Sequence, residues 1–196
     1  VEAGYLYEPR ARGGFYPTPR WAQVVGAFTQ AEPLPEALVD AVQHLARETG
    51  ETVWASAPSG LSAVFLHVVE SSAPVRYAAE TGKRVPIHVT ASGQALLARM
   101  PERDREVILR KVSWEGQRPN APQNRAEFDR LFREGRARGW FQSASAYSPE
   151  LGGVAMPVEI GGRIFSITVA GPLYRVEDKG PEHARLIGRT IAAVLG

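Results

Sequence analysis

The sequence has 196 residues, of which 44% are hydrophobic and 22% charged, a balance typical of a folded domain. Lys and Arg nearly balance Asp and Glu, and the net charge is only +2. Basic and acidic residues alternate, as in PERDREVILRK (101–111), which argues against a concentrated nucleic-acid-binding patch. The absence of cysteine excludes disulfides and thiolate metal sites and fits a reducing, cytoplasmic compartment. No apolar run approaches the roughly 20 residues of a membrane-spanning helix.

The first 33 residues carry too little apolar sequence to bury a core of their own. Residues 3–17 predict a short hairpin whose aromatic strands flank the turn Gly13-Gly14. Residues 21–28 place apolar side chains at helical spacing, and we interpret residues 21–33 as a linker helix. The chain begins with Val rather than Met, and we therefore expect a further segment upstream.

The main domain is predicted to begin near residue 34 and to follow the order helix, strands, helices, strands, helix. Apolar residues at helical spacing predict helices at 35–50, 90–100, 101–112, 125–139 and 183–195. Runs rich in β-branched and aromatic residues predict strands at 52–58, 62–71, 75–80, 140–147, 153–160 and 163–170. The pair Gly161-Gly162 predicts a tight hairpin between the last two strands. Helices around a mostly antiparallel sheet describe an α+β domain.

The strand predicted at 163–170 divides its side chains unequally between the two faces of the sheet. Alternate residues point to opposite faces. The set that begins with Phe165 is bulky and suited to a core, whereas the other set is small and partly polar: Ser166, Thr168 and Ala170. Two interpretations stay open: a helix packs tightly on the small face, or a cavity lies there whose hydroxyls orient a ligand.

Small residues also crowd the start of the helix predicted at 90–100, in the sequence Thr90-Ala91-Ser92-Gly93. The first N–H groups of a helix lack intrahelical partners and lie at the positive end of its dipole. Small side chains would let a ligand carboxylate approach these N–H groups closely. The alternative is that Thr90 or Ser92 merely caps the helix.

The sequence contains no familiar catalytic or metal-binding pattern. GxSxG, SxxK, HExxH, P-loop and GxGxxG motifs are all absent. Asp40 and His44, four residues apart, are more typical of a solvated helix face than of a metal site. We therefore predict no catalytic residues, no cofactor and no metal. The rival hypothesis is a small hydrolase or lyase that uses His88 with Ser92 or Ser143. A further alternative is a structural dimerisation module with a filled interior.

Several blocks of the sequence, in this order and spacing, resemble the effector-binding domain of IclR-type bacterial transcription regulators. They are GETVWASAP (50–58), VRYAAETGKRVPIHVTASGQALLA (75–98), RARGW (136–140), VAMPV (154–158) and VAGP (169–172). The resemblance covers residues 34–196 and implies a GAF-like α+β fold without catalysis.

Residues 1–20 resemble the wing of the family's winged helix-turn-helix, whose recognition helix would lie upstream. The resemblance implies one small organic effector per domain, DNA as a partner through the upstream head, and homodimers or tetramers. In the wing, Arg10 and Arg12 would contact the DNA backbone.

The resemblance also implies an effector pocket, in which the backbone N–H groups of Ala91 and Ser92 hold a ligand carboxylate. The pocket would include Pro74, Tyr77, Ala91, Ser92, Ser143, Leu151, Gly153, Thr168 and Ala170. The family usually has Asp in place of Ser143, often Cys in place of Gly153, and Ser in place of Ala170. We therefore expect a pocket that is less acidic and roomier than usual. This favours a larger or aromatic acid over a very small hydroxy or keto acid.

Overall fold

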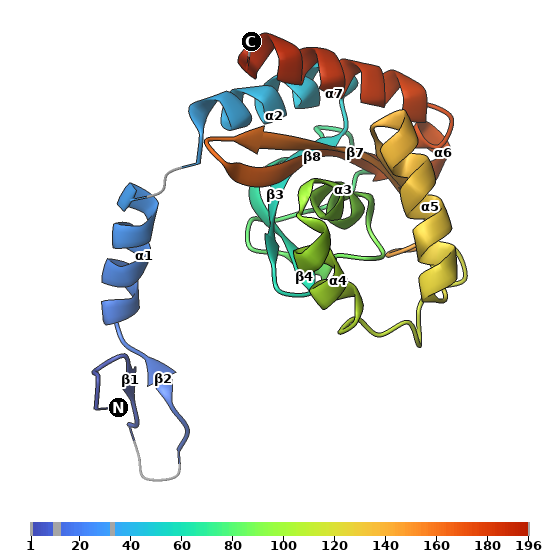
Figure 1. Cartoon of the computed structure of the whole chain (residues 1–196). Coiled ribbons are helices and arrows are strands. Elements are labelled where there is room, and N and C mark those ends of the chain that lie inside the picture. The colour runs from blue at the N-terminus through green and yellow to red at the C-terminus, as the bar shows by residue number, and fades with distance from the viewer. Residues whose placement is uncertain (1, 10–12, 32–33, 196) are drawn as a thin grey trace. The chain divides into compact units, whose positions relative to one another are not determined.

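The computed structural model (Figure 1) describes residues 2–9, 13–31 and 34–195. The chain forms two compact units, Val1–Pro35 and Glu36–Gly196. In the first unit, strands β1 (Leu6–Tyr7) and β2 (Tyr16–Pro17) pair antiparallel, and helix α1 (Arg20–Ala31) follows. The antiparallel strand pair and the helix expected in this segment are confirmed, whereas the turn expected at Gly13-Gly14 borders residues 10–12, which lie outside the described residues. Arg10 and Arg12, the predicted DNA contacts, lie outside the described residues.

The second unit contains one sheet, which has six strands within the described residues in the order β5-β4-β3-β8-β7-β6, with every neighbouring pair antiparallel. In chain order its elements are α2 (Glu36–Thr49), β3 (Thr52–Ser59), β4 (Ser62–Val69), β5 (Arg84–Pro86), α3 (Ala91–Arg99), α4 (Glu102–Leu109), α5 (Arg125–Arg138), β6 (Phe141–Ala144), β7 (Leu151–Ile160), β8 (Arg163–Pro172), α6 (Leu173–Val176) and α7 (Gly180–Leu195).

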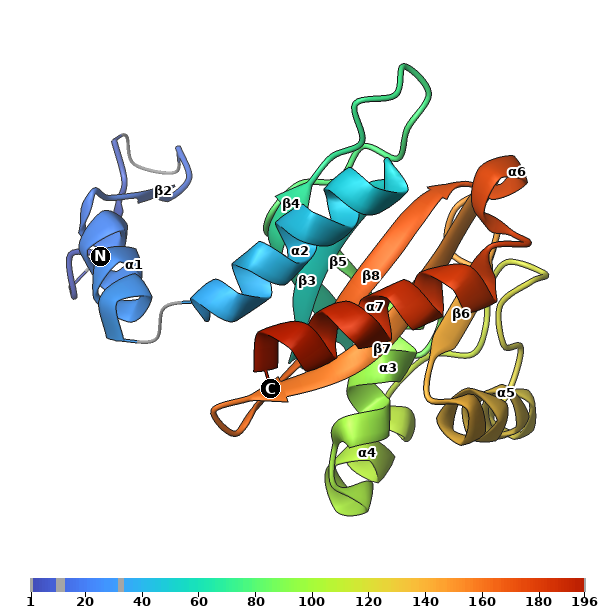
Figure 2. The same ribbon diagram turned by 90° about the horizontal axis from the view of Figure 1, so that it is seen from above.

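Helices cover both faces of this sheet. Helices α2 and α7 lie side by side over one face, and α3 lies against the other, as Figures 1 and 2 show together. The amphipathic pattern of α2 explains its orientation, because Leu38, Val42 and Leu45 are completely buried. The expected α+β architecture, an antiparallel sheet flanked by helices, is confirmed.

The hairpin between β7 and β8 turns at Gly161 and Gly162, whose φ angles are 58° and 74°. Two successive residues with positive φ form the type I′ turn that matches the twist of the strands, and glycine reaches these angles without steric cost. The tight hairpin predicted from the Gly-Gly pair is present, and it fixes the register that aligns β7 with β8.

The strand predicted at 75–80 is wrong, because this segment contains no regular secondary structure. Its backbone groups form hydrogen bonds with side chains instead: Thr52 Oγ1 donates to the carbonyl of Tyr77 at 2.7 Å, and Ala79 N donates to Glu70 Oε1 at 3.1 Å. The strand that pairs with β4 is β5, a few residues later.

Helix α3 begins with a close contact that explains part of its small-residue start. Thr90 caps the helix, and its Oγ1 accepts a hydrogen bond from Gly93 N at 3.2 Å. Gly93 then packs directly against the backbone of the preceding turn: a Cβ atom placed there would lie 2.1 Å from the carbonyl oxygen of Ile87. Only glycine allows this approach.

We expect Gly93→Ala to lower the free energy of unfolding by about 3 kcal/mol, the upper end of overpacking effects, because backbone atoms cannot move aside as a flexible side chain can. Gly188→Ala, in α7, is the matched control. Its added Cβ would contact only Met156, at an ordinary 3.6 Å, so the free energy of unfolding of this variant should rise by about 0.5–1 kcal/mol. Chemical denaturation measures both changes, and a Gly93→Ala protein as stable as the wild type would disprove the contact.

Candidate ligand-binding site

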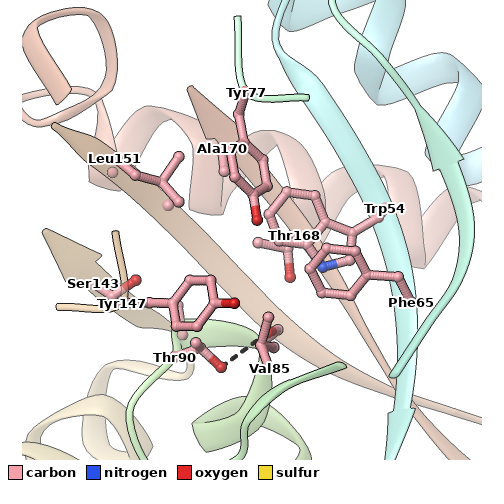
Figure 3. Close-up of a pocket in the computed structure, with 14 residues that line it drawn as sticks. Trp54, Phe65, Tyr77, Val85, Thr90, Ser143, Tyr147, Leu151, Thr168 and Ala170 are labelled. Atoms are coloured by element: carbon pink, nitrogen blue, oxygen red, sulfur yellow. Dashed lines mark hydrogen bonds between the residues drawn. The ribbon is translucent and has the colours of Figure 1, made fainter. Parts of the chain in front are cut away.

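A cavity of about 30 Å³ lies between the sheet and the N-terminus of α3 (Figure 3). All six strands of the sheet and the start of α3 contribute to its wall, together with the irregular segments that carry Tyr77 and Tyr147. The lining residues are Trp54, Phe65, Tyr77, Val85, Thr90, Ala91, Ser92, Ser143, Tyr147, Leu151, Gly152, Gly153, Thr168 and Ala170.

The structure brings together most of the residues expected in the pocket. Those that line this single cavity are Tyr77, Ala91, Ser92, Ser143, Leu151, Gly153, Thr168 and Ala170. Pro74 does not line the cavity and is exposed. It lies three residues before Tyr77, whose carbonyl accepts the hydrogen bond from Thr52 that holds the segment to the domain.

Ser166 was expected to share the floor of the cavity with Thr168, and this prediction is wrong. Its Oγ lies 2.7 Å from Ser56 Oγ, and both serines are fully buried. The two hydroxyls satisfy each other across the β3–β8 pair, so they are not available to a ligand. Of the three small residues on this face of β8, only Thr168 therefore offers a polar side-chain atom to the cavity.

Three aromatic side chains in the cavity wall were not predicted from the sequence: Trp54, Phe65 and Tyr147. Trp54 stands opposite Thr168 in the β3–β8 register, so alternation along β3 could have placed it on this face. Its ring stacks on Phe65 with centroids 4.5 Å apart. No pattern in the sequence singles out Tyr147, which lies outside regular structure.

These rings make the cavity smaller than expected. Ligand pockets usually measure about 300–1,000 Å³, which is about 10 to 30 times the volume here. The small residues at positions 143, 153 and 170 therefore do not create a roomy pocket. The aromatic rings of the lining project into the space beside these small residues; they are Trp54, Phe65, Tyr77 and Tyr147.

The charges around the cavity favour an anion. Ala91 and Ser92 hold the first two positions of α3, where backbone N–H groups lack intrahelical acceptors, and both are nearly fully buried. No acidic side chain stands among the fourteen described residues of the lining. Lys83 adds a cation beside Tyr77, with its Nζ 4.8 Å from the centre of that ring. A hydrogen bond to Tyr77 raises the pKa of Lys83, so the ammonium stays charged.

Tyr77 and Leu151 separate the cavity from a neighbouring open cleft of about 330 Å³. Both residues line the two spaces, and the cleft is also lined by Val75, Glu150 and Tyr174. The segments that carry Tyr77 and Tyr147 are irregular, so these two rings form the part of the wall that is not fixed by a helix or strand.

Segment 71–80, which carries Tyr77, is tied to the junction between α2 and β3. Thr52 Oγ1 donates to the carbonyl of Tyr77 and accepts a hydrogen bond from Ser71 N at 3.1 Å. Ser71 Oγ in turn donates to the carbonyl of Gly50 at 2.5 Å. One end of the cavity wall is therefore joined to the residues that follow α2 directly.

An ion pair extends this connection. Arg175 donates through Nε and Nη2 to the two carboxylate oxygens of Glu51 at 2.7 and 2.8 Å, and Glu51 is only 5% exposed. Arg175 Nη1 also donates to the carbonyl of Val75 at 2.8 Å. The bidentate contact with Glu51 raises the pKa of Arg175, so its charge is fixed at any physiological pH.

Comparison with known protein families matches residues 28–194 to the family described as bacterial transcriptional regulator IclR, C-terminal. The chain belongs to the IclR family. Among curated proteins it is 40% identical, over 68 residues, to the "Probable transcriptional regulator SauR" of Cupriavidus necator. That match covers 35% of this chain and 27% of the relative.

Solved structures of IclR proteins share the fold. An IclR-family transcriptional regulator from Brucella abortus superposes with a TM-score of 0.83 at 22% identity, covering 99% of this chain and 74% of that one. The IclR protein of Thermotoga maritima gives a TM-score of 0.79 at 20% identity, covering 98% and 79%. At these identities the likeness establishes the architecture.

The IclR family consists of transcription regulators rather than enzymes, and the geometry of His88 agrees. Its Nε2 lies 3.1 Å from the carbonyl oxygen of Ser113, and its ring packs edge-on against Trp114. Burial lowers the pKa of His88. Ser92 Oγ pairs with Thr90 Oγ1 at 3.2 Å, and among the described residues the His88 side chain is hydrogen-bonded neither to Ser92 nor to Ser143, the two serines that the hydrolase hypothesis offers.

Two further absences concern the described part of this IclR-family chain. Its side chains form no group of three or more His, Asp or Glu that could hold a metal ion. None of the helices in residues 2–9, 13–31 and 34–195 is both long and apolar enough to cross a membrane.

The hydrogen bonds of Thr52 predict how firmly segment 71–80 is held. We expect Thr52→Val to leave the carbonyl of Tyr77 and the N–H of Ser71 without partners, at a cost of about 1–3 kcal/mol. Amide hydrogen exchange of the segment should then become faster, whereas Thr52→Ser, which keeps the hydroxyl, should retain the wild-type rate. Equal exchange in all three proteins would show that this hydroxyl does not hold the segment.

Proposed function

We propose that this chain is the effector-sensing part of a DNA-binding IclR regulator and that its effector is an organic acid. The carboxylate would bind the N–H groups of Ala91 and Ser92. The observation that carries the proposal is a helix N-terminus that opens onto a buried cavity without an acidic side chain. A carboxylate there gains hydrogen bonds from two backbone donors and a favourable interaction with the helix dipole.

The cap of α3 leaves these two donors to a ligand. Thr90 Oγ1 is engaged by Gly93 N, the third residue of the helix, and Gln94 N donates to the carbonyl of Thr90. Capping therefore accounts for the later N–H groups of the first turn but not for those of Ala91 and Ser92. The capping and anion-binding interpretations of this helix start are thus compatible, because they use different N–H groups.

The aromatic lining favours a larger or aromatic acid over one with two or three carbons. Trp54, Phe65, Tyr77 and Tyr147 offer flat apolar surfaces, which stabilise a ring better than a short chain. A ring does not fit in about 30 Å³, so part of the wall has to move. If Tyr77 turned toward the neighbouring cleft, the cavity and the cleft would join.

Displacement of Tyr77 also supplies a route for the signal. The carbonyl of Tyr77 accepts a hydrogen bond from Thr52, and Arg175 donates both to the carbonyl of Val75 and to Glu51. Glu51 and Thr52 come directly after α2 in the chain. Helix α2 follows the linker to the first unit along the chain. An effector that binds better when segment 71–80 is displaced would shift the population of that state, and with it the position of α2.

In the whole protein, we expect this shift to reach DNA-binding heads that lie upstream in the sequence. Arg10 and Arg12 would add minor contacts to the DNA backbone from the wing. Homodimers or tetramers would present two heads to one operator, and the protein would act in the cytoplasm.

The variant Ala91→Pro tests the carboxylate site. Proline is favoured at the first position of a helix, and the extended backbone of Thr90, with ψ at 150°, suits a residue before proline. The change removes one proposed donor and places the ring Cδ where the carboxylate would lie. We expect affinity for benzoate, measured by calorimetry, to fall at least about tenfold, the effect of losing a charge-assisted hydrogen bond. Affinity for benzamide should remain low.

Ala91→Gly keeps the N–H group and is the matched control, so its benzoate affinity should stay near that of the wild type. Equal binding of benzoate by Ala91→Pro and wild type would contradict the carboxylate site. Binding of acetate, glyoxylate or pyruvate with no binding of benzoate would contradict the preference for a larger acid. If no acid raises the melting temperature, the domain is a structural module with a filled interior.

A further inference from the structure

Two buried polar atoms in the cavity have no hydrogen-bond partner among the described residues: Trp54 Nε1 and Thr168 Oγ1. Their side chains are 5% and 2% exposed, so bulk water does not reach them. Figure 3 shows both atoms on the cavity side of their residues, facing the same space. An unsatisfied buried group costs about 1–3 kcal/mol, so two of them side by side point to a group that completes them.

The sheet holds these two atoms close together. Trp54 and Thr168 are register partners on β3 and β8, and they therefore stand on the same face. The neighbouring positions along this face offer no competing partner, because Ser166 is paired with Ser56 and Ala170 has no polar side-chain atom. The indole N–H and the threonine hydroxyl thus form a fixed pair on rigid strands.

We propose that Trp54 and Thr168 form a polar subsite that binds an oxygen substituent on the ring of the effector. This inference rests on the proposed function, in which the carboxylate lies at Ala91 and Ser92. The effector would then be an aromatic acid with a hydroxyl or carbonyl oxygen distant from its carboxylate, so that both polar ends of the ligand are bonded and its ring contacts the aromatic wall.

The donor chemistry of the pair decides which substituent fits. An indole N–H only donates, so the ligand atom has to accept. A phenolic oxygen can accept from Trp54 Nε1 and also donate to Thr168 Oγ1, whereas a carbonyl oxygen can accept from both. A methyl group or chlorine of similar size would leave both protein atoms unpaired. Sites built to hydrogen-bond a substituent discriminate strongly against analogues that lack it.

The test compares benzoate, 3-hydroxybenzoate, 4-hydroxybenzoate and 4-chlorobenzoate by calorimetry on the 196-residue chain. We expect at least one hydroxybenzoate to bind at least about tenfold more tightly than benzoate and 4-chlorobenzoate, since one satisfied pair replaces two unsatisfied atoms. Trp54→Phe keeps an aromatic ring against Phe65 and removes the N–H. Thr168→Val keeps the shape and removes the hydroxyl. Each variant should reduce the advantage of the favoured hydroxybenzoate over benzoate, measured as the ratio of the two affinities in the same protein, to within about threefold.

A second measurement does not depend on how well these variants fold. In the wild-type chain, the indole N–H resonance of Trp54 should shift when the favoured hydroxybenzoate is added and much less with 4-chlorobenzoate. If the wild type binds benzoate and both hydroxybenzoates equally and the resonance does not move, the subsite is disproved while the carboxylate site stands. If none of the four acids binds, both the subsite and the proposed function are disproved.

Discussion

The position of α3 depends on the contact between Gly93 and the backbone of Ile87. The chain has to turn sharply between β5 and α3, and Thr90 stabilises that turn by donating to the carbonyl of Pro86 at 3.0 Å. Because Gly93 has no side chain, the first turn of the helix packs against this preceding turn. The N-terminus of α3 is thereby fixed beside Thr168 and Ala170, and the free N–H groups become part of a cavity wall rather than a solvated helix end.

The rest of the cavity combines a rigid half with a less constrained half. Paired strands fix Trp54 and Thr168, whereas Tyr77 and Tyr147 lie on irregular segments. Displacement of Tyr77 by a ligand would break the contact between this ring and Lys83, and the ligand would gain contacts with the aromatic residues of the cavity wall. Thr52 and Arg175 join the displaced segment to the end of α2. We therefore propose that effector binding and signalling are coupled through the hydrogen bonds of this one segment.

The sequence predicted what depends on local pattern. The apolar faces of the helices, the Gly161-Gly162 turn and the small face of β8 all follow from residue spacing. Eight of the residues that line the cavity were named from the resemblance to the IclR family. The errors have tertiary causes. Residues 75–80 have the composition of a strand, but the side chains of Thr52 and Glu70 form hydrogen bonds with the backbone of this segment, and it does not pair with a strand. Ser166 pairs with Ser56, a partner 110 residues away, and Tyr147 reaches the cavity from a loop whose path no periodicity encodes.

The most direct test of the anion site is an NMR titration that follows the backbone amides of Ala91 and Ser92. When benzoate is added, we predict downfield shifts of these two amide protons that saturate together, because both donate to the bound carboxylate. The amide of Gly93 should move less, since Thr90 already accepts its hydrogen bond. Saturable binding that shifts other resonances but leaves those of Ala91 and Ser92 unchanged would contradict a carboxylate at the start of α3.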